Sequence, residues 1–354
     1  MKFNILAMSW FTMLSTLLGC SAQATEGFES VDVDKFEQVI ASDSVLRLDV
    51  RTPKEFAAGH IAEAINIDMM ASDYEQRAIR TLPKDRTVAL YCRTGNRSKT
   101  AASILVKNGY TVVELAPGIV GWERAKKPVT TEEIDAFLSP NGTPVKFHCI
   151  QHGTLAIEAG NRWIHVDPVA DAIPPVTDYT TMPKADLILV THGHHDHLDM
   201  KAIGQLSKDE TKIIANEQSA KDIQGAQVMK NGDSTELFGW KVTAVPAYNT
   251  SADKQNFHPK GRDNGYLIEI DGLAVYIGGD TEVIPEMQAL AGKVDVAFLP
   301  CNLPYTMTPE QVEQAARAIK PRVLFPYHYG ETNIKKLLNL LGETDIDVRI
   351  RQYQ

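Results

Sequence analysis

The sequence predicts an α/β protein with two domains: a small parallel-sheet domain over residues 28–128 and a larger α/β domain over residues 145–354. The chain has 354 residues, which is more than one hydrophobic core usually organises. Short apolar runs alternate with helical segments in both halves, as in α/β folds. A turn-rich stretch, Ser139–Pro144, lies within a predicted linker over residues 129–144 and separates the halves.

The composition is that of a globular chain, and it excludes some classes of partner. Hydrophobic residues make up 44% and charged residues 23%, while the formal charge is 36 − 45 = −9. An acidic chain lacks the basic footprint of nucleic-acid binding, so we predict a small-molecule substrate and no nucleic-acid partner. Four cysteines are too few for a disulfide scaffold. The oligomeric state stays open.

The first segment, residues 1–24, predicts export. A lysine at position 2 precedes the apolar run Ile5–Leu18, which is too short to span a membrane and is typical of a signal peptide. The run ends in Leu17–Cys20, which resembles a bacterial lipobox, with cleavage after Ala24 as the alternative. We expect a periplasmic protein that is anchored to the outer membrane through lipid on Cys20 and has no other membrane contact.

The elements of the first domain follow a strand–helix order. Val45–Val50 and Thr87–Tyr91 are rich in β-formers, and Ser98–Asn108 has helical apolar spacing that ends at a glycine. After this domain, the acidic segment Glu132–Leu138 predicts a short helix within the linker.

The second domain is richer in strand-like runs, and these are interleaved with helices such as Pro309–Ala318. The predicted strands are Trp163–Val166, Leu187–Val190, Tyr266–Ile270, Leu273–Ile277, Val294–Leu299 and Val323–Pro326.

A cysteine-containing loop, Cys92–Ser98, lies between a predicted strand and a predicted helix. Backbone N–H groups and the positive end of the helix can point at the sulfur, and Arg93 and Arg97 add positive charge. These features favour a thiolate, which is a nucleophile able to carry or transfer a sulfur atom.

This loop resembles the active-site loop of the rhodanese (sulfurtransferase) family, with four residues between Cys92 and Arg97, where related phosphatases have five. The resemblance extends over Leu48–Arg51, Glu55-Phe56, Gly59–Ile61, Ala64–Asn66 and Gly121-Trp122. It implies catalytic roles for Cys92 and Arg97 and a sulfane-sulfur donor as a partner. A structural cysteine in an inactive rhodanese fold is the alternative.

A histidine-rich segment at a predicted strand end indicates a metal site. In Thr191–His197, the side chains of His192 and His194 can face one metal while Asp196 and His197 face a second. Imidazole and carboxylate ligands suit zinc, and also manganese or iron.

Further ligands are expected from other strand ends. Asp280, in a Gly-Gly-Asp-Thr context, could bridge two metals through its two oxygens, and His328 follows another strand. Three strand-end positions with ligating side chains make a solvated histidine cluster the less favoured interpretation.

The order of these histidine and aspartate residues along the chain resembles that of the metallo-β-lactamase superfamily, which implies an αββα sandwich over residues 145–354. The branch with the closest likeness includes ascorbate-6-phosphate lactonase and N-acyl-phosphatidylethanolamine phospholipase D. Supporting residues are Ile164–Pro168, Asn216-Glu217, Thr306–Thr308 and Pro326–Gly330. The resemblance implies that Asp196 both ligates metal and orients the attacking water.

The chain departs from the family pattern at two places. Asn249 occupies the region where many relatives have a third histidine, which predicts a weaker second metal position. Cys301–Pro304 replaces a frequent Gly-Gly and is expected to alter substrate selection. His152 is equally compatible with supporting a ligand and with a structural role. His258 lies in a polar loop that could cover the cleft, where a plain surface histidine is the favoured interpretation and binding of substrate or metal is the alternative. Cys149 and Cys301 flank apolar runs and are expected to be packing residues.

Together these features predict a hydrolase of an ester, lactone or phosphodiester bond that uses a metal-bound hydroxide, with an appended sulfurtransferase-like domain. The leading alternative is an iron-dependent persulfide dioxygenase in sulfur metabolism. A non-enzymatic sulfur- or metal-binding lipoprotein is the third interpretation.

Overall fold

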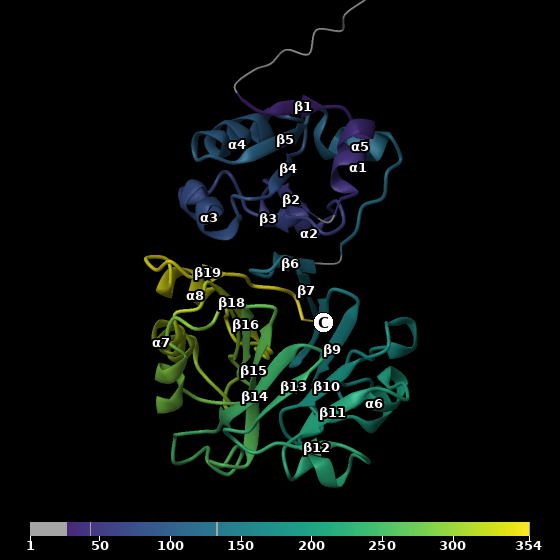
Figure 1. Ribbon diagram of the computed structural model, residues 1–354. Helices are drawn as coiled ribbons and strands as arrows, with labels where there is room; N and C mark the ends of the chain where they lie inside the picture. The colour runs from purple at the N-terminus through teal and green to yellow at the C-terminus, as the bar shows by residue number, and fades with distance from the viewer. Residues whose placement is uncertain (1–26, 43, 132–133, 354) are drawn as a thin grey trace, which may run out of the picture.

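A computed structural model describes residues 27–42, 44–131 and 134–353 as two domains, one above the other in Figure 1. The expected signal peptide and Cys20 lie outside these residues. Within the described ranges, every helix is too short or too polar to cross a membrane.

The first domain is a five-stranded parallel sheet in the order β1-β5-β4-β2-β3, which confirms the predicted small parallel-sheet domain. Its strands are β1 (Glu29–Val31), β2 (Val45–Asp49), β3 (Ile65–Asn66), β4 (Thr87–Tyr91) and β5 (Thr111–Leu115). Its helices are α1 (Val33–Ile40), α2 (Pro53–Ala57), α3 (Tyr74–Thr81), α4 (Asn96–Lys107) and α5 (Gly118–Arg124).

Both faces of this sheet are buried, because alternate residues of each strand enter two separate apolar clusters. On β4, Leu90 packs with Leu105 of α4, while Tyr91 joins the opposite cluster with Phe36 and Trp122. Strands buried on both faces read as continuous apolar runs, and this explains why the sequence predicted them.

The second domain is a sandwich of two seven-stranded sheets with helices on the outer faces, as expected for the metallo-β-lactamase fold. The first sheet, in the order β12-β11-β10-β9-β8-β7-β6, contains β6 (Ile134–Leu138), β7 (Pro144–Gln151), β8 (Thr154–Ala159), β9 (Arg162–Val166), β10 (Leu187–Val190), β11 (Lys212–Ala215) and β12 (Gln227–Val228). The second, in the order β13 to β19, contains β13 (Ser234–Leu237), β14 (Trp240–Ala247), β15 (Asp263–Ile270), β16 (Leu273–Ile277), β17 (Val296–Pro300), β18 (Val323–Tyr327) and β19 (Asp347–Val348).

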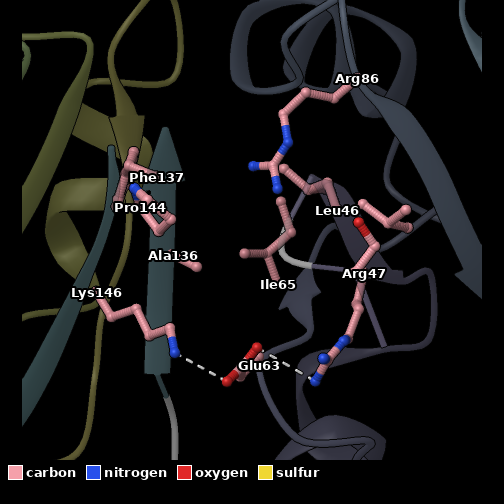
Figure 2. A pocket seen from close by; sticks show the side chains of 11 residues that line it. Leu46, Arg47, Glu63, Ile65, Arg86, Ala136, Phe137, Pro144 and Lys146 are labelled. Atoms are coloured by element: carbon pink, nitrogen blue, oxygen red, sulfur yellow. Dashed lines mark hydrogen bonds and ion pairs between the residues drawn. The ribbon is translucent and has the colours of Figure 1, made fainter. Parts of the chain in front are cut away.

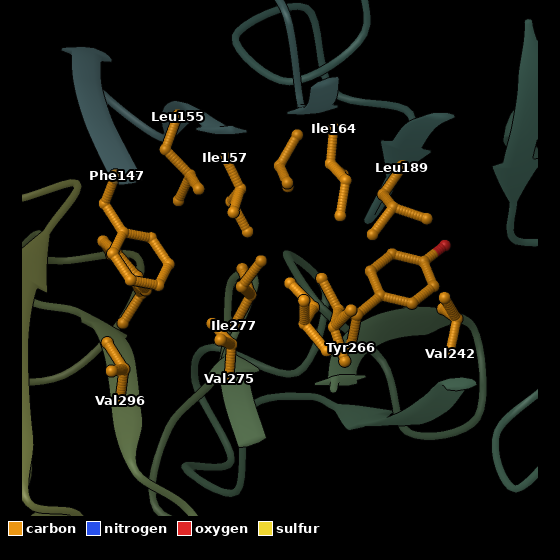
Figure 3. Packing of buried hydrophobic residues seen from close by; sticks show 14 of the residues in the cluster. Phe147, Leu155, Ile157, Ile164, Leu189, Val242, Tyr266, Val275, Ile277 and Val296 are labelled. Atoms are coloured by element: carbon orange, nitrogen blue, oxygen red, sulfur yellow. The ribbon is translucent and has the colours of Figure 1, made fainter. Parts of the chain in front are cut away.

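The core lies between the two sheets, where side chains of β7 to β10 face those of β14 to β18 (Figure 3). The ring of Phe147 lies 5.4 Å from that of Phe298. Outside the sandwich, α6 (Met200–Leu206) covers the first sheet, and α7 (Pro309–Ile319) and α8 (Lys336–Leu340) cover the second.

The predicted linker helix over Glu132–Leu138 is wrong, because Ile134–Leu138 forms strand β6. This strand pairs antiparallel with β7, and Phe137 packs edge-on against Phe147 at 5.3 Å. Pairing with an open sheet edge and burial of an aromatic ring outweigh the helix preference of an acidic segment.

The two domains meet along the edge strands β3 and β6. Lys146 Nζ lies 2.9 Å from Glu63, which also contacts Arg47 at 3.3 Å (Figure 2). The pocket beside these residues has a volume of about 40 Å³. Small-molecule sites measure about 300–1,000 Å³, so this pocket is a gap in the interface and not a substrate site.

A buried ionic network supports the same interface. Asp135 accepts hydrogen bonds from Arg349 at 2.7 Å and from Arg351 at 2.8 Å. Arg349 also donates to Asp347 at 2.9 Å, and Asp347 contacts Arg77 of the first domain at 3.4 Å. The network therefore joins β6 and β19 of the second domain to α3 of the first.

Replacing Arg349 with Met should lower the free energy of unfolding by about 3 kcal/mol, because buried Asp135 and Asp347 each lose a cationic partner. Arg317→Met is the matched control, since the exposed Arg317–Glu313 pair should contribute under about 0.5 kcal/mol. Urea unfolding measures both variants, and equal destabilisation of the two would contradict this assignment.

Candidate functional site

The loops that follow β7, β10, β16 and β18 meet at one end of the sandwich. They bring together every metal ligand that the sequence predicted. These are His192, His194, Asp196 and His197 after β10, Asp280 after β16 and His328 after β18. His152, after β7, joins the same cluster.

One group of potential ligands consists of three imidazoles, those of His192, His194 and His258, whose ring nitrogens lie within 4.8 Å of one another. His192 Nε2 and His194 Nδ1 are 3.0 Å apart. Three converging imidazoles are a familiar divalent-metal environment.

A second group consists of His152, Asp196 and His328. Asp196 Oδ2 lies 3.2 Å from His152 Nε2 and 3.6 Å from His328 Nε2. The rings of His152 and His328 are tilted by 43° to each other, with their centroids 3.7 Å apart. Asp196 is partly exposed, so this group faces solvent.

Asp280 lies between the two groups and offers one oxygen to each. Its Oδ2 is 3.3 Å from His258 Nε2, and its Oδ1 is 3.4 Å from His197 Nε2 and 3.6 Å from His328 Nε2. This is the geometry expected of a carboxylate that bridges two metals.

Two carboxylates outside the cluster hold the imidazoles in place. Asp167 accepts from His197 Nδ1 at 2.8 Å and is itself held by Thr191. Asp263 lies 3.3 Å from His258 Nδ1. Such contacts orient a ligating ring and select its tautomer. Sequence analysis did not identify either role, although the segment containing Asp167 supported the family resemblance.

The donor set fits a metal ion. Within the described chain, the buried atoms His197 Nε2, His328 Nε2 and Asp280 Oδ1 have no hydrogen-bond partner. Buried polar atoms of this kind are costly unless a ligand satisfies them. A side chain added at Gly153 would come within 2.7 Å of the His197 ring, so glycine is what keeps that space open.

Protonation preferences agree with metal binding. Burial, together with the neighbouring imidazoles, holds the pKa of His192 well below its usual value and favours the neutral form that ligates a metal. Burial also opposes the charged form of His197, but Asp280 and Asp167 outweigh it and raise the pKa of His197 to about 10. His197 thus lies in a negatively charged environment, which also attracts a metal cation.

Three residues at this site have a left-handed backbone conformation. His152, Asp167 and His328 have φ angles of +46°, +45° and +49°. A non-glycine residue in this left-handed region costs about 1–3 kcal/mol. Such a conformation persists only where the surrounding structure maintains it, and residues of this kind cluster at functional sites.

The interpretation of His258 as a surface histidine is wrong, because its side chain is buried within the first ligand group. His258, nine residues after Asn249, therefore supplies the third imidazole that Asn249 does not. The Asn249 amide instead donates to the backbone carbonyls of Lys254 and Tyr305, so it shapes the loop that delivers His258. This removes the basis for expecting a weaker second metal position.

The Cys92 loop forms a separate site in the first domain. Cys92 Sγ is buried and accepts hydrogen bonds from Gly95 N at 3.2 Å and Ser98 Oγ at 3.3 Å. Gly95 precedes α4, so the sulfur lies at the N-terminus of a helix, as the sequence predicted. Arg97 pairs through both of its terminal nitrogens with Glu55, at 2.7 and 2.8 Å.

The other two cysteines of the described chain have packing positions. Cys301 is fully buried in the cluster beneath α7, and Cys149 packs against the central core.

In protein loaded with zinc, His258→Ala should reduce the bound metal by about one ion per chain, because the first group would keep only two imidazoles. His195→Ala is the matched control in the same histidine-rich loop, since the His195 side chain is exposed and belongs to neither ligand group. Elemental analysis after dialysis measures both variants. Full zinc retention in His258→Ala would remove His258 from the ligand set.

Comparisons with known proteins agree with this geometry. Residues 146–328 match the family model of the beta-lactamase superfamily domain, and residues 32–125 match that of the rhodanese-like domain. A metal-dependent hydrolase from Thermococcus kodakarensis is 34% identical over 196 residues, which cover 52% of this chain and 85% of the relative.

Two solved structures are also similar. A protein from Parabacteroides distasonis, named as a metal-dependent hydrolase, is 49% identical with a TM-score of 0.61, over 63% of this chain and 100% of that one. A metallo hydrolase from Ignicoccus hospitalis is 25% identical with a TM-score of 0.51, over 59% and 95% of the two chains. The chain therefore belongs to the metallo-β-lactamase superfamily of metal-dependent hydrolases and carries a rhodanese-like domain ahead of its catalytic fold.

Proposed function

We propose that the protein hydrolyses an ester, lactone or phosphodiester bond at two divalent metal positions in the His/Asp cluster, with zinc as the resident metal. The observation that carries the proposal is the placement of Asp280, which has one oxygen toward each ligand group. Divalent metals in such sites lower the pKa of coordinated water toward neutrality and polarise the scissile bond.

The protein's own groups have distinct roles in this proposal. His152 contacts Asp196 at 3.2 Å and so fixes the position of this partly exposed carboxylate, which would orient the attacking water. Asp167 and Asp263 keep His197 and His258 in orientation. Because these partners are already in place, little reorganisation is needed when substrate arrives.

An iron-dependent persulfide dioxygenase remains the alternative activity. That chemistry needs one iron with open coordination positions and consumes O₂. Two ligand groups that share Asp280 support a two-metal hydrolase instead.

We also propose that Cys92 accepts a sulfane sulfur. Its thiolate would attack the outer sulfur of thiosulfate, forming a new S–S bond while the S–S bond of thiosulfate breaks and sulfite leaves. The N–H of Gly95 and the first turn of α4 lie where they can stabilise the persulfide charge.

The two sites are expected to work independently. Lys146, which contacts the first domain at Glu63, precedes His152 by six residues of mostly extended chain, or roughly 20 Å at strand spacing. Among the described residues, the ion pairs between the domains involve Glu63, Arg77, Lys146 and Asp347, none of which belongs to the Cys92 loop or to the metal cluster.

The zinc-loaded protein should hydrolyse p-nitrophenyl ester or phosphodiester probes, and Asp280→Asn should lower kcat/KM at least about 100-fold, because it weakens both metal positions at once. A parallel oxygen electrode with glutathione persulfide should record no uptake. Bound iron with oxygen uptake and no hydrolysis would replace this proposal with the dioxygenase.

Cys92→Ser should abolish the mass gain of one sulfur atom that thiosulfate gives the wild type, while leaving bound metal unchanged, because the sites lie in separate domains. Cys149→Ser is the matched control and should keep the gain. Intact-protein mass spectrometry reads both variants, and a gain that survives in Cys92→Ser would exclude Cys92 as the acceptor.

A further inference from the structure

Two loops beside the metal cluster expose large apolar side chains. The loop over residues 249–262 carries Phe257 immediately before His258, and the loop over residues 301–307 carries Leu303 and Tyr305. Phe257, Leu303 and Tyr305 are 36%, 47% and 44% exposed, and we call these three residues the apolar rim. The rings of Phe257 and Tyr305 meet edge to face, with their centroids 5.1 Å apart.

Asn249 joins the rim to one side of the metal cluster. Its amide Nδ2 donates to the Tyr305 carbonyl at 2.9 Å, and its backbone N–H donates to the His258 carbonyl at 2.8 Å. The residue found where a third histidine was expected therefore connects the rim to the ligand that replaces that histidine.

The loop over residues 301–307 also reaches the other side of the cluster. A Cβ placed at Gly330, two residues after His328, would lie 3.3 Å from Asn302 Oδ1. The loop over residues 301–307 therefore borders the segments that carry both His258 and His328.

The cations of the 249–262 loop are already paired. The pairs are Lys254 with Glu282 at 3.0 Å, Lys260 with Glu286 at 3.1 Å, and Arg262 with Asp263 at 2.7 Å. Recognition of a phosphate relies on Arg or Lys side chains that are available to its oxygens. This loop offers aromatic surface in place of such cations.

We propose that the apolar rim binds the acyl or aromatic group of a carboxylic ester or lactone, which makes these compounds, and not phosphodiesters, the substrate class of the metal centre. This inference rests on the proposed hydrolase function and narrows it. Leu303 and Tyr305 are specificity-determining residues in this account, because their exposed surface becomes buried against the substrate.

The test compares the zinc-loaded full chain with its Leu303→Ser and Tyr305→Ser variants. The probes are p-nitrophenyl acetate, p-nitrophenyl octanoate and bis(p-nitrophenyl) phosphate. Leu338→Ser is the matched control, since Leu338 is 49% exposed on α8 and belongs neither to the two rim loops nor to a ligand group. Binding of octanoate against acetate, measured by calorimetry, supplies a second readout that needs no turnover.

The wild type should favour octanoate over acetate esters in kcat/KM, and each rim variant should reduce that preference roughly tenfold, with the control unchanged. Octanoate binding should weaken in the same variants. A preference for the phosphodiester, or an octanoate preference that the rim variants leave intact, would overturn the inference. If no probe is hydrolysed, the hydrolase proposal fails, and calorimetry still tests whether the apolar rim binds an acyl group. Octanoate binding that weakens in the Leu303 and Tyr305 variants supports the rim as the acyl site, and octanoate binding that is unchanged in them overturns it.

Discussion

The burial of imidazole and carboxylate groups that cannot satisfy one another is the constraint on which this structure depends. His197, His328 and Asp280 bring buried polar atoms to one point without hydrogen-bond partners in the described chain. Leaving such atoms unsatisfied costs free energy, and pairing them with a divalent cation removes that cost. The surrounding residues hold this cluster in place. Asp167 and Asp263 orient two of the rings, glycine at position 153 leaves space beside His197, and three residues adopt a left-handed backbone conformation.

The sandwich supplies the rigid frame for that cluster. Strands β10, β16 and β18 end at the same end of the sandwich, so each delivers its ligands from a buried, well-packed element. The first domain packs elsewhere, against β6 and β19, where Arg349 links Asp135 to Asp347. The Cys92 loop differs from the metal cluster, because a backbone N–H group and a helix N-terminus are placed to stabilise a single anionic sulfur.

Most of the fold and much of the site could be predicted from sequence because the relevant signals are local. The buried strands are continuous apolar runs, and His192 to His197 lie within one short segment. His258 was favoured as a surface residue because its position in the cluster depends on tertiary contacts, such as those of its carbonyl with Asn249 and of its ring with Asp263, which no local pattern encodes. Strand β6 was missed for a similar reason, since its conformation is decided by pairing with β7.

The most direct test of the central claim is anomalous diffraction from crystals of the zinc-loaded protein, recorded on both sides of the zinc absorption edge. The account predicts two peaks on either side of Asp280, one among His192, His194 and His258 and the other beside Asp196 and His328. Absence of both peaks, or zinc bound only at other residues, would contradict the assignment of the cluster as a two-position metal centre.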